Sequence, residues 1–408
     1  MTIREELGDE VATRGYDPFD YKVHEDPYPY YTWMRAHAPV YRNEARDFWA
    51  LSRHADIKDA LRNPALFSSR NGISLEPELW GPHAVKTSLF LAMDPPEHGA
   101  HRAPCSGVFT PKRVAALEPR IRELARWRLE PLRDLPRFDF AADYAAALPN
   151  DVVCEMLGVP DDYWDQIRAD TDQLNMREDG SSDRNPNTVA AALRMANYFM
   201  ELVAEMRRHP GDDVTSMMIE ADVNGARHTD SDIVAFLFLM ISAGNESTGK
   251  TIGNAWYIGS LMPDVRQQGL NGRADDWAKE TLRYDTANQM TARTLTQDTT
   301  IHGTELRAGA RVAILPGSGN RDERAFENAD RFDLDRDTSR LISFGFGPHH
   351  CIGSALATLV MRIALEEIAA FVSDYEIDMA SAQRVHSPHN RGFASLPCEV
   401  THRPKPWT

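Results

Sequence analysis

The chain has 408 residues, of which 42% are hydrophobic and 26% are charged, a composition typical of a globular protein. Its 45 Lys and Arg against 61 Asp and Glu leave a net charge of −16, which argues against nucleic acid or an anionic membrane surface as the main partner. The N-terminus is charged where a secretory signal is apolar, and the longest apolar run, residues 233–243, is shorter than the about 18 residues that span a bilayer. We therefore expect a cytoplasmic protein with no membrane anchor and no nucleic-acid partner.

The beginning of the chain alternates between short helical and short extended patterns. We expect a helix over residues 27–36, strands over 40–42 and 48–51, and a second helix over 54–62.

The region from residue 111 to 208 has an almost entirely helical pattern. Apolar residues recur at i, i+3 and i+4, most clearly over 114–129 and 187–207. Residues 180–187 are polar, contain several turn-forming residues and have no apolar face, so we expect a loop or lid there.

A long buried helix is predicted to follow Thr229. Thr229 suits the cap position, Asp232 stands three residues later, and residues 233–241 are continuously apolar. Such a helix should be buried on nearly all sides.

Strand patterns return in the last third of the chain. Residues 299–302 and 311–315 are predicted strands joined through Gly309, and a last strand is expected between 393 and 400. No internal repeat or linker-like tract divides the chain, so we expect a single, mainly α domain.

The four cysteines, Cys105, Cys154, Cys351 and Cys398, lie far apart and form no C-x-x-C pair, so the sequence predicts neither a disulfide framework nor a zinc site. Cys351 differs because glycines frame it in the pattern F-x-x-G-x-x-x-C-x-G, from Phe344 to Gly353, with a helical pattern directly after it. The glycines permit tight turns and close approach of a flat ligand, and the helix N-terminus stabilises negative charge on sulfur.

This pattern resembles the cysteine loop of the cytochrome P-450 haem-thiolate monooxygenases, and the length resembles soluble bacterial members of that family. The resemblance implies haem b as cofactor, dioxygen as co-substrate, and Cys351 as the axial ligand of the iron, which favours O–O cleavage. It implies a mainly α fold with small β-sheets, a triangular helical body with the haem between the long central helix and the helix after the cysteine loop.

The same resemblance implies one domain over residues 1–408. Its β-rich part should comprise about 38–70 and 295–318, and its helical core about 95–290 and 340–375.

Glu280 and Arg283 match the E-x-x-R motif of the family, and their i, i+3 spacing brings the two charges together on a helix. With residues 320–322 and 329–332 in the expected order downstream, we expect a buried structural ion-pair network that includes Arg331 and supports the cysteine loop.

Four groups occupy the positions that bind the haem carboxylates in the family. His98 and Arg102 belong to a run resembling D-P-P-x-H-x-x-x-R, and Arg293 and His349 complete the set. A planar guanidinium suits a carboxylate, but Pro104 is expected to kink or shorten the helix that carries Arg102. The other cofactor-binding positions implied by the resemblance are Ala243, Gly244, Phe344, Gly345 and Gly353.

The run from Ala243 to Thr248 resembles the oxygen-activation element of the family. Gly244 would leave a groove beside the ligand, and Glu246 and Ser247 would supply a carboxyl and a hydroxyl for proton relay. Ser247 stands where the family usually has Thr, so Ser247 and Thr248 both remain candidates for the relay hydroxyl. Ala287 and Arg307 also depart from the family by replacing prolines.

Substrate-facing positions follow by analogy with the family, and most are apolar, as expected for a largely apolar organic substrate. They are the loop 71–91, Leu239, Met240, Ala243, the segment 288–291 with the amides of Asn288 and Gln289, and Phe393.

The resemblance implies a monooxygenase that receives electrons from NAD(P)H through a ferredoxin reductase and a ferredoxin, because the sequence contains no G-x-G-x-x-G between a strand and a helix. The alternatives are a peroxide-driven haem-thiolate enzyme and a non-catalytic haem sensor or carrier. A third alternative makes Cys351 a thiol nucleophile with His349 or His350 as its base.

Overall fold

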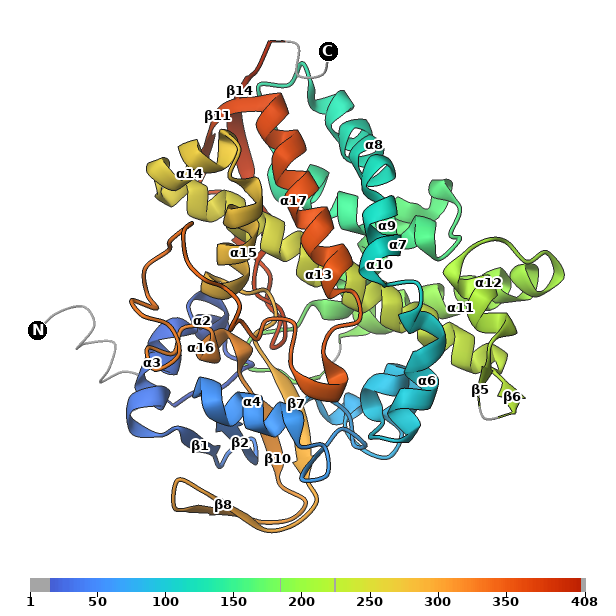
Figure 1. Cartoon of the computed structure of the whole chain (residues 1–408), viewed down its shortest axis with the longest axis vertical. Helices are drawn as coiled ribbons and strands as arrows, with labels where there is room; N and C mark the ends of the chain where they lie inside the picture. Colours follow the sequence, from blue (N-terminus) through green and yellow to red (C-terminus); the bar gives the residue numbers. More distant parts are fainter. Residues whose placement is uncertain (1–14, 184, 224, 405–408) are drawn as a thin grey trace, which may run out of the picture.

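The structure is a computed structural model that describes residues 15–183, 185–223 and 225–404. Helices make up most of it, and Figure 1 shows the long helix α13 running through the middle with α17 crossing it and the largest sheet at the lower edge. The mainly α fold with small β-sheets is therefore confirmed.

The helices are distributed along the whole described chain. They are α2 (Tyr21–Glu25), α3 (Tyr28–His37), α4 (His54–Arg62), α5 (Val85–Ser88), α6 (Glu97–Ser106), α7 (Pro111–Ala116), α8 (Glu118–Leu129), α9 (Ala147–Met156), α10 (Trp164–Asn175), α11 (Pro186–Arg208), α12 (Val214–Glu220), α13 (Asp230–Leu261), α14 (Pro263–Leu270), α15 (Ala274–Tyr284), α16 (Pro316–Gly319) and α17 (Ser354–Phe371).

The strands are short. They are β1 (Val40–Asn43), β2 (Phe48–Leu51), β3 (Phe67–Ser68), β4 (Arg137–Asp139), β5 (Asp222–Val223), β6 (Ala226–Arg227), β7 (Thr291–Leu295), β8 (Thr299–Ile301), β9 (Thr304–Leu306), β10 (Arg311–Ile314), β11 (Val372–Ile377), β12 (Gln383–Arg384), β13 (Phe393–Ser395) and β14 (Pro397–His402).

The largest sheet combines β1, β2 and β3 from the N-terminal part of the chain with β7 and β10 from its last third. The strand order is β1-β2-β10-β7-β3. β10 pairs in parallel with β2 and antiparallel with β7, whereas β8 turns back on β9 as a separate hairpin. The predicted strands at 299–302 and 311–315 therefore exist but belong to different sheets. β8 pairs with β9, and the antiparallel neighbour of β10 is β7.

Several predicted helices are observed almost as expected, including 27–36, 54–62 and 187–207. The predicted helix 114–129 is divided instead, since α7 ends at Ala116 and α8 begins at Glu118. Pro119 explains the break, because proline fits the first turn of a helix but removes a hydrogen bond from a helix interior.

The residues around the predicted loop 180–187 and around Pro104 also differ in detail from expectation. The described part of the loop, 180–183, is irregular and Asn185 already caps α11, while residue 184 lies outside the described residues. α6 is a short helix that continues to Ser106, two residues beyond Pro104, so the helix does not end at this proline.

α13 packs against several other helices, including α9, α11, α14, α15 and α17. Its N-terminus has the predicted capping box, in which Thr229 and Asp232 bond each other's backbone. An added Cβ at Gly244 would lie 2.8 Å from Val153 Cγ2 and one at Gly249 2.9 Å from the Ala145 carbonyl oxygen, so the two glycines let the chain around α9 approach closely.

The aromatic residues beside α13 fix the position of its C-terminal half. The Trp256 ring stacks between Phe140 and Tyr375, with centroid distances of 4.2 and 3.5 Å. Offset or parallel stacking of this kind adds about 0.5–1.5 kcal/mol per pair to the gain from burying the rings.

The E-x-x-R pair is buried, with side-chain exposures of 1% for Glu280 and 0% for Arg283. Arg283 Nη2 and Nε donate to the two Glu280 oxygens at 2.7 and 2.9 Å. Its remaining N–H groups donate to the carbonyls of Asn320, Ala329 and Arg331.

The second cation of this network is Arg336 and not the expected Arg331. Arg336 Nε lies 3.1 Å from Glu280 Oε1, whereas Arg331 contributes only its carbonyl. The side chain of Asn320 accepts from the backbone N–H of Ile342 at 2.8 Å and thereby connects the network to the segment before the cysteine loop.

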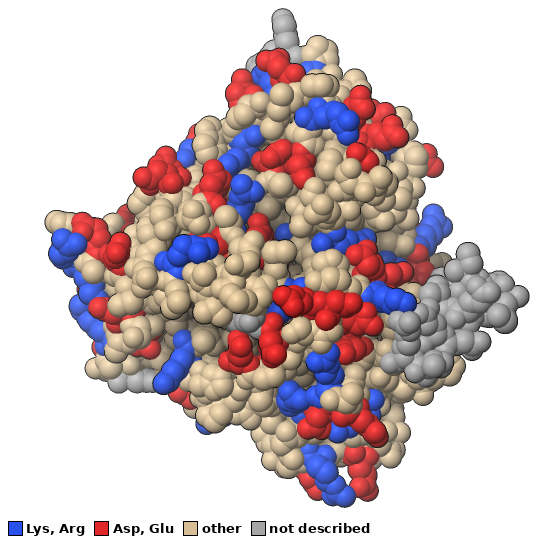
Figure 2. All heavy atoms as spheres, turned by 180° about the vertical axis from the view of Figure 1, so that it is seen from behind, with Lys and Arg blue, Asp and Glu red and all other residues tan. Residues whose placement is uncertain are grey.

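Acidic and basic side chains are intermixed over the face opposite to that of Figure 1 (Figure 2). Among the described residues, no helix combines the length and the apolar composition needed to cross a membrane. The four cysteines are all unpaired thiols.

We predict that Glu280→Gln lowers the free energy of unfolding by about 3–5 kcal/mol, because it leaves two buried guanidinium groups without their carboxylate. Urea unfolding would measure the loss. The control is Asp275→Asn, which breaks the exposed Lys279–Asp275 pair of the same helix and should cost about 0–1 kcal/mol. Equal losses in the two variants would contradict a buried structural network.

Candidate active site

The loop before α17 presents Cys351 through two left-handed glycines, Gly345 at φ 70° and Gly347 at φ 71°. An added Cβ at Gly347 would lie 2.6 Å from the Leu61 carbonyl oxygen, so this position requires glycine for both conformation and space. The backbone N–H of Cys351 donates to the Phe344 carbonyl at 2.8 Å and closes the loop.

The surroundings of the Cys351 thiol shift its pKa in both directions. Burial raises its pKa, whereas a hydrogen bond from the Gly353 backbone N–H and the charge of Arg102 lower it. Because α17 starts at Ser354, its N-terminal partial positive charge also favours a thiolate. A metal ion that binds the sulfur would deprotonate it outright.

A cavity of about 370 Å³ separates the cysteine loop from α13. Cys351, Phe344, Gly345 and Gly353 line one side of this cavity, and Ala243, Gly244, Ser247 and Thr248 line another. The volume lies in the range of small-molecule sites.

One edge of the cavity gathers four basic side chains from three parts of the chain: α6, β7 and the cysteine loop. Arg293 of β7 is 4% exposed, and burial lowers its pKa to about 10. Its Nη1 donates only locally, to Thr291 Oγ1 and the Ala292 carbonyl. Arg102 of α6 lines the cavity and donates to the His350 carbonyl at 2.6 Å, which joins α6 to the cysteine loop.

His349 also lines this edge, and the His98 ring packs beside it with a centroid distance of 4.1 Å. Within the described structure, His98 Nε2 and His349 Nδ1 are buried without a hydrogen-bond partner. Burial and the nearby Arg293 lower the pKa of His349 to about 3, and burial and Arg102 lower the pKa of His98.

This edge fits the carboxylates of a haem. Asp94, whose charge acts on His98 and Arg293, already accepts hydrogen bonds from Ser68 Oγ at 2.6 Å and from the Ser69 N–H at 2.8 Å. Cationic and unpartnered groups in a buried position favour an anionic ligand, and a carboxylate accepts several such donors at once. His98, Arg102, Arg293 and His349 would hold the haem edge while Cys351 faces the iron.

Glu246 does not line the cavity itself, whereas the next residues of α13, Ser247 and Thr248, do. Its Oε2 accepts a hydrogen bond of 2.8 Å from Asn390 Nδ2, and Asn390 in turn lines the cavity. Burial raises the pKa of Glu246 to about 7 although Lys250 favours the ionised form. A carboxyl with a pKa near 7 gains and loses its proton near neutral pH.

The hydroxyl groups along α13 bond to carbonyls of their own helix. Ser247 Oγ donates to the Ala243 carbonyl at 3.3 Å, and Thr251 Oγ1 donates to the Ser247 carbonyl at 2.8 Å. Thr251 also lines the cavity and was not among the sequence candidates. Thr251 follows Ser247 by one helical turn, and this spacing predicts that the two residues share one face of α13.

The expected substrate-facing residues fall into two groups. Leu239, Met240 and Asn288 line the cavity, together with Phe90 and Leu91 of the predicted loop 71–91. Gln289 and Phe393 lie elsewhere among the described residues. Gln289 accepts from the Tyr31 hydroxyl at 2.9 Å, and the Phe393 ring packs 4.7 Å from that of Tyr257. Gln289 directly follows Asn288 in an extended segment, where successive side chains point in opposite directions. The Gln289 side chain therefore points away from the cavity that Asn288 lines.

Sequence reasoning missed a buried charged cluster that joins three segments around the cavity. Glu76 and Arg177 form an ion pair with side-chain exposures of 3% and 4%, and His389 Nε2 lies 3.3 Å from Glu76 Oε2. Burial opposes ionisation of Glu76, but His389 and Arg177 hold its pKa at about 2. No local spacing reveals this cluster, because its members come from distant parts of the chain.

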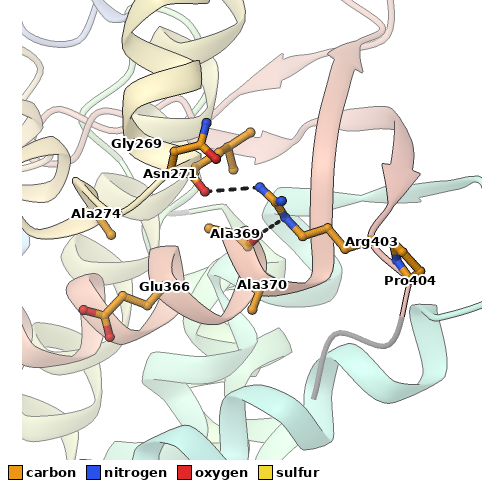
Figure 3. Close-up of a pocket in the computed structure, with 10 residues that line it drawn as sticks. Gly269, Asn271, Ala274, Glu366, Ala369, Ala370, Arg403 and Pro404 are labelled. Atoms are coloured by element: carbon orange, nitrogen blue, oxygen red, sulfur yellow. Dashed lines mark hydrogen bonds between the residues drawn. The ribbon is translucent and has the colours of Figure 1, made fainter. Parts of the chain in front are cut away.

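A second hollow, of about 420 Å³, opens between the α14–α15 turn and the end of α17 (Figure 3). Its Arg403 donates to the carbonyls of Ala369 and Leu270, and its Glu366 is paired with Arg362. These polar groups are engaged within the protein, so the cavity at Cys351 is the better candidate for chemistry.

Comparison with known proteins agrees with this geometry. The cytochrome P450 family model matches residues 275–402. The chain is 43% identical over 406 residues to a Mycobacterium tuberculosis protein named cytochrome P450 123, covering 99% of this chain and 100% of that one. It is 30% identical over 393 residues to linalool 8-monooxygenase of Pseudomonas putida, covering 92% and 96%. The crystal structure of CYP109E1 from Bacillus megaterium in complex with testosterone matches with a TM-score of 0.84 and 28% identity, covering 93% of this chain and 98% of that one.

We predict that Gly347→Ala lowers the free energy of unfolding by about 1–2 kcal/mol or more, because the left-handed backbone and the Leu61 carbonyl both oppose a Cβ. Thermal or urea unfolding would measure it. Gly107→Ala is the matched control, since nothing lies within 4 Å of an added Cβ there. A Gly347→Ala protein as stable as the control would contradict the role given to this turn.

We predict a pH-dependent stability difference between the wild type and Glu246→Gln. The folded protein holds the Glu246 proton more tightly than the unfolded chain, so the wild type loses stability relative to the variant as the pH rises from 4.5 to about 7. The loss should reach about 3 kcal/mol and then stay constant.

Urea unfolding of both proteins across this pH range would measure the difference. Glu201→Gln, which changes an exposed carboxyl of α11, should follow the wild type. Parallel curves for the wild type and Glu246→Gln would show that Glu246 is not held in its neutral form.

Proposed function

Because the chain belongs to the cytochrome P450 family, whose monooxygenases bind haem b and use dioxygen as co-substrate, we propose that it oxygenates a largely apolar small organic molecule. The proposed electron source is NAD(P)H, through a ferredoxin reductase and a ferredoxin. One oxygen atom of dioxygen enters a C–H bond or a double bond of the substrate, and the other leaves as water with two electrons and two protons.

The observation that carries this proposal is the cavity with Cys351 on one side and the 243–248 segment of α13 on another. We assign Cys351 as the residue whose thiolate would hold the haem iron. Haem b held by a thiolate supplies the chemistry that cleaves dioxygen. His98, Arg102, Arg293 and His349 bind the haem carboxylates and orient the group in the cavity.

Proton supply is the role proposed for α13. Glu246 holds a proton next to the cavity, and Asn390 fixes its carboxyl by the hydrogen bond to Oε2. Ser247 and Thr248 bring hydroxyl groups to the cavity surface. Their short side chains leave room for a ligand in the cavity.

The substrate class follows from the remaining cavity wall. Phe90, Leu91, Leu239 and Met240 provide an apolar surface, and Asn288 adds one amide that suits a hydroxyl or carbonyl oxygen. Linalool and testosterone, which are named with two relatives, are members of this class.

We predict that purified protein with NADH, a ferredoxin and its reductase incorporates label from oxygen-18 dioxygen into members of a panel of apolar compounds that includes linalool and testosterone. Mass spectrometry of the products would detect the label. Labelled product that forms only with hydrogen peroxide, and never with NADH and the redox proteins, would contradict the proposal and favour the peroxide-driven alternative.

A further inference from the structure

Lys250 is a buried lysine on α13, one turn after Glu246 and on the same helical face. Its side chain is only 6% exposed, which is rare for lysine because an ammonium loses most of its hydration on burial. The cysteine loop, the basic edge and the apolar wall of the cavity do not account for this charge.

The surroundings of Lys250 hold its side chain in one place. Its ammonium lies 3.8 Å from Asp172 Oδ1 on α10, whose side chain is 48% exposed. On the other side, an added Cβ at Gly392 would lie 2.5 Å from Lys250 Cβ. A glycine is therefore required in the turn before β13 for the lysine stem to pass between this turn and α10.

The groups that act on the charge of Glu246 come from three elements. They are Lys250 on α13, Asp172 on α10, and His389 and Asn390 in the turn before β13. Lys250 is the strongest of the influences that favour the ionised carboxylate, and Asp172 opposes it from a solvated position. An ammonium close to a carboxyl in a buried region favours loss of the carboxyl proton.

We propose that Lys250 is a positioning residue that promotes the release of the Glu246 proton toward the cavity. In each transfer the O–H bond of Glu246 breaks, the proton passes to water in the cavity, and a carboxylate remains. The carboxylate takes its next proton from solvent at the Asp172 end of this face. Lys250 does not touch the substrate in this role. This inference depends on the proposed monooxygenase function.

The test compares Lys250→Met, which keeps the length but removes the charge, with Lys250→Arg, which keeps the charge. Infrared difference spectroscopy of the holoenzyme across a pH series measures the protonated carboxyl band, and Glu246→Gln identifies which band belongs to Glu246. In Lys250→Met the titration midpoint should rise by at least about one pH unit, because the favourable ammonium is lost. Lys250→Arg should titrate like the wild type.

The control is Lys279→Met, which removes an exposed lysine paired with Asp275 and changes the net charge equally. It should leave the Glu246 midpoint unchanged. The second readout is the pH dependence of product formed per NADH oxidised, which should move upward in Lys250→Met by the same amount as the infrared midpoint.

A Lys250→Met protein with wild-type circular dichroism and an unchanged Glu246 midpoint would overturn the inference. If the wild type forms labelled product in that case, only the role of Lys250 fails. If the wild type forms no product with NADH and the redox proteins, the proposed function fails, whatever the infrared midpoint shows.

Discussion

The position of the Cys351 sulfur is the constraint on which the rest of the structure depends. A thiolate ligand must face a cavity, yet its loop must be rigid enough to hold the sulfur against the pull of a metal ion. Gly345 and Gly347 give the loop a conformation that other residues oppose, and the start of α17 adds a favourable partial charge. The buried network at Glu280 supports the same loop from behind, through Asn320 and the backbone at Ile342.

The electrostatics of the interior differ from those of the whole chain. The protein carries a net charge of −16, but Arg102 and Arg293 make the cavity edge cationic. Burial lowers the pKa of Arg293, and burial together with the nearby Arg293 lowers the pKa of His349. Glu246 on α13 is bonded to Asn390, which lines another part of the cavity, and burial raises the pKa of this carboxyl to about 7. The surroundings of the cavity therefore suit an anionic group at the basic edge and proton exchange at Glu246.

Local sequence patterns predicted the structural features that residues close together in the chain determine, such as single helices. Residues 54–62 have a regular 3.6-residue period, and α4 has these bounds. β7 was not predicted, because four of its five residues are buried and it therefore lacks the alternation of a half-exposed strand. In the site, motif spacing located Cys351 and its glycine loop. The direction of Glu246 toward Asn390 and the place of Gln289 beside Tyr31 depend on contacts between distant segments, which spacing does not encode.

The central claim is that Cys351 binds the iron of haem b as a thiolate. The optical spectrum of the purified protein, reduced with dithionite and exposed to carbon monoxide, tests it most directly. The account predicts a strongly red-shifted Soret band, which is the signature of thiolate-ligated haem. A Soret band without this shift in freshly reduced, folded protein, or no haem absorption after haem supplementation, would contradict it.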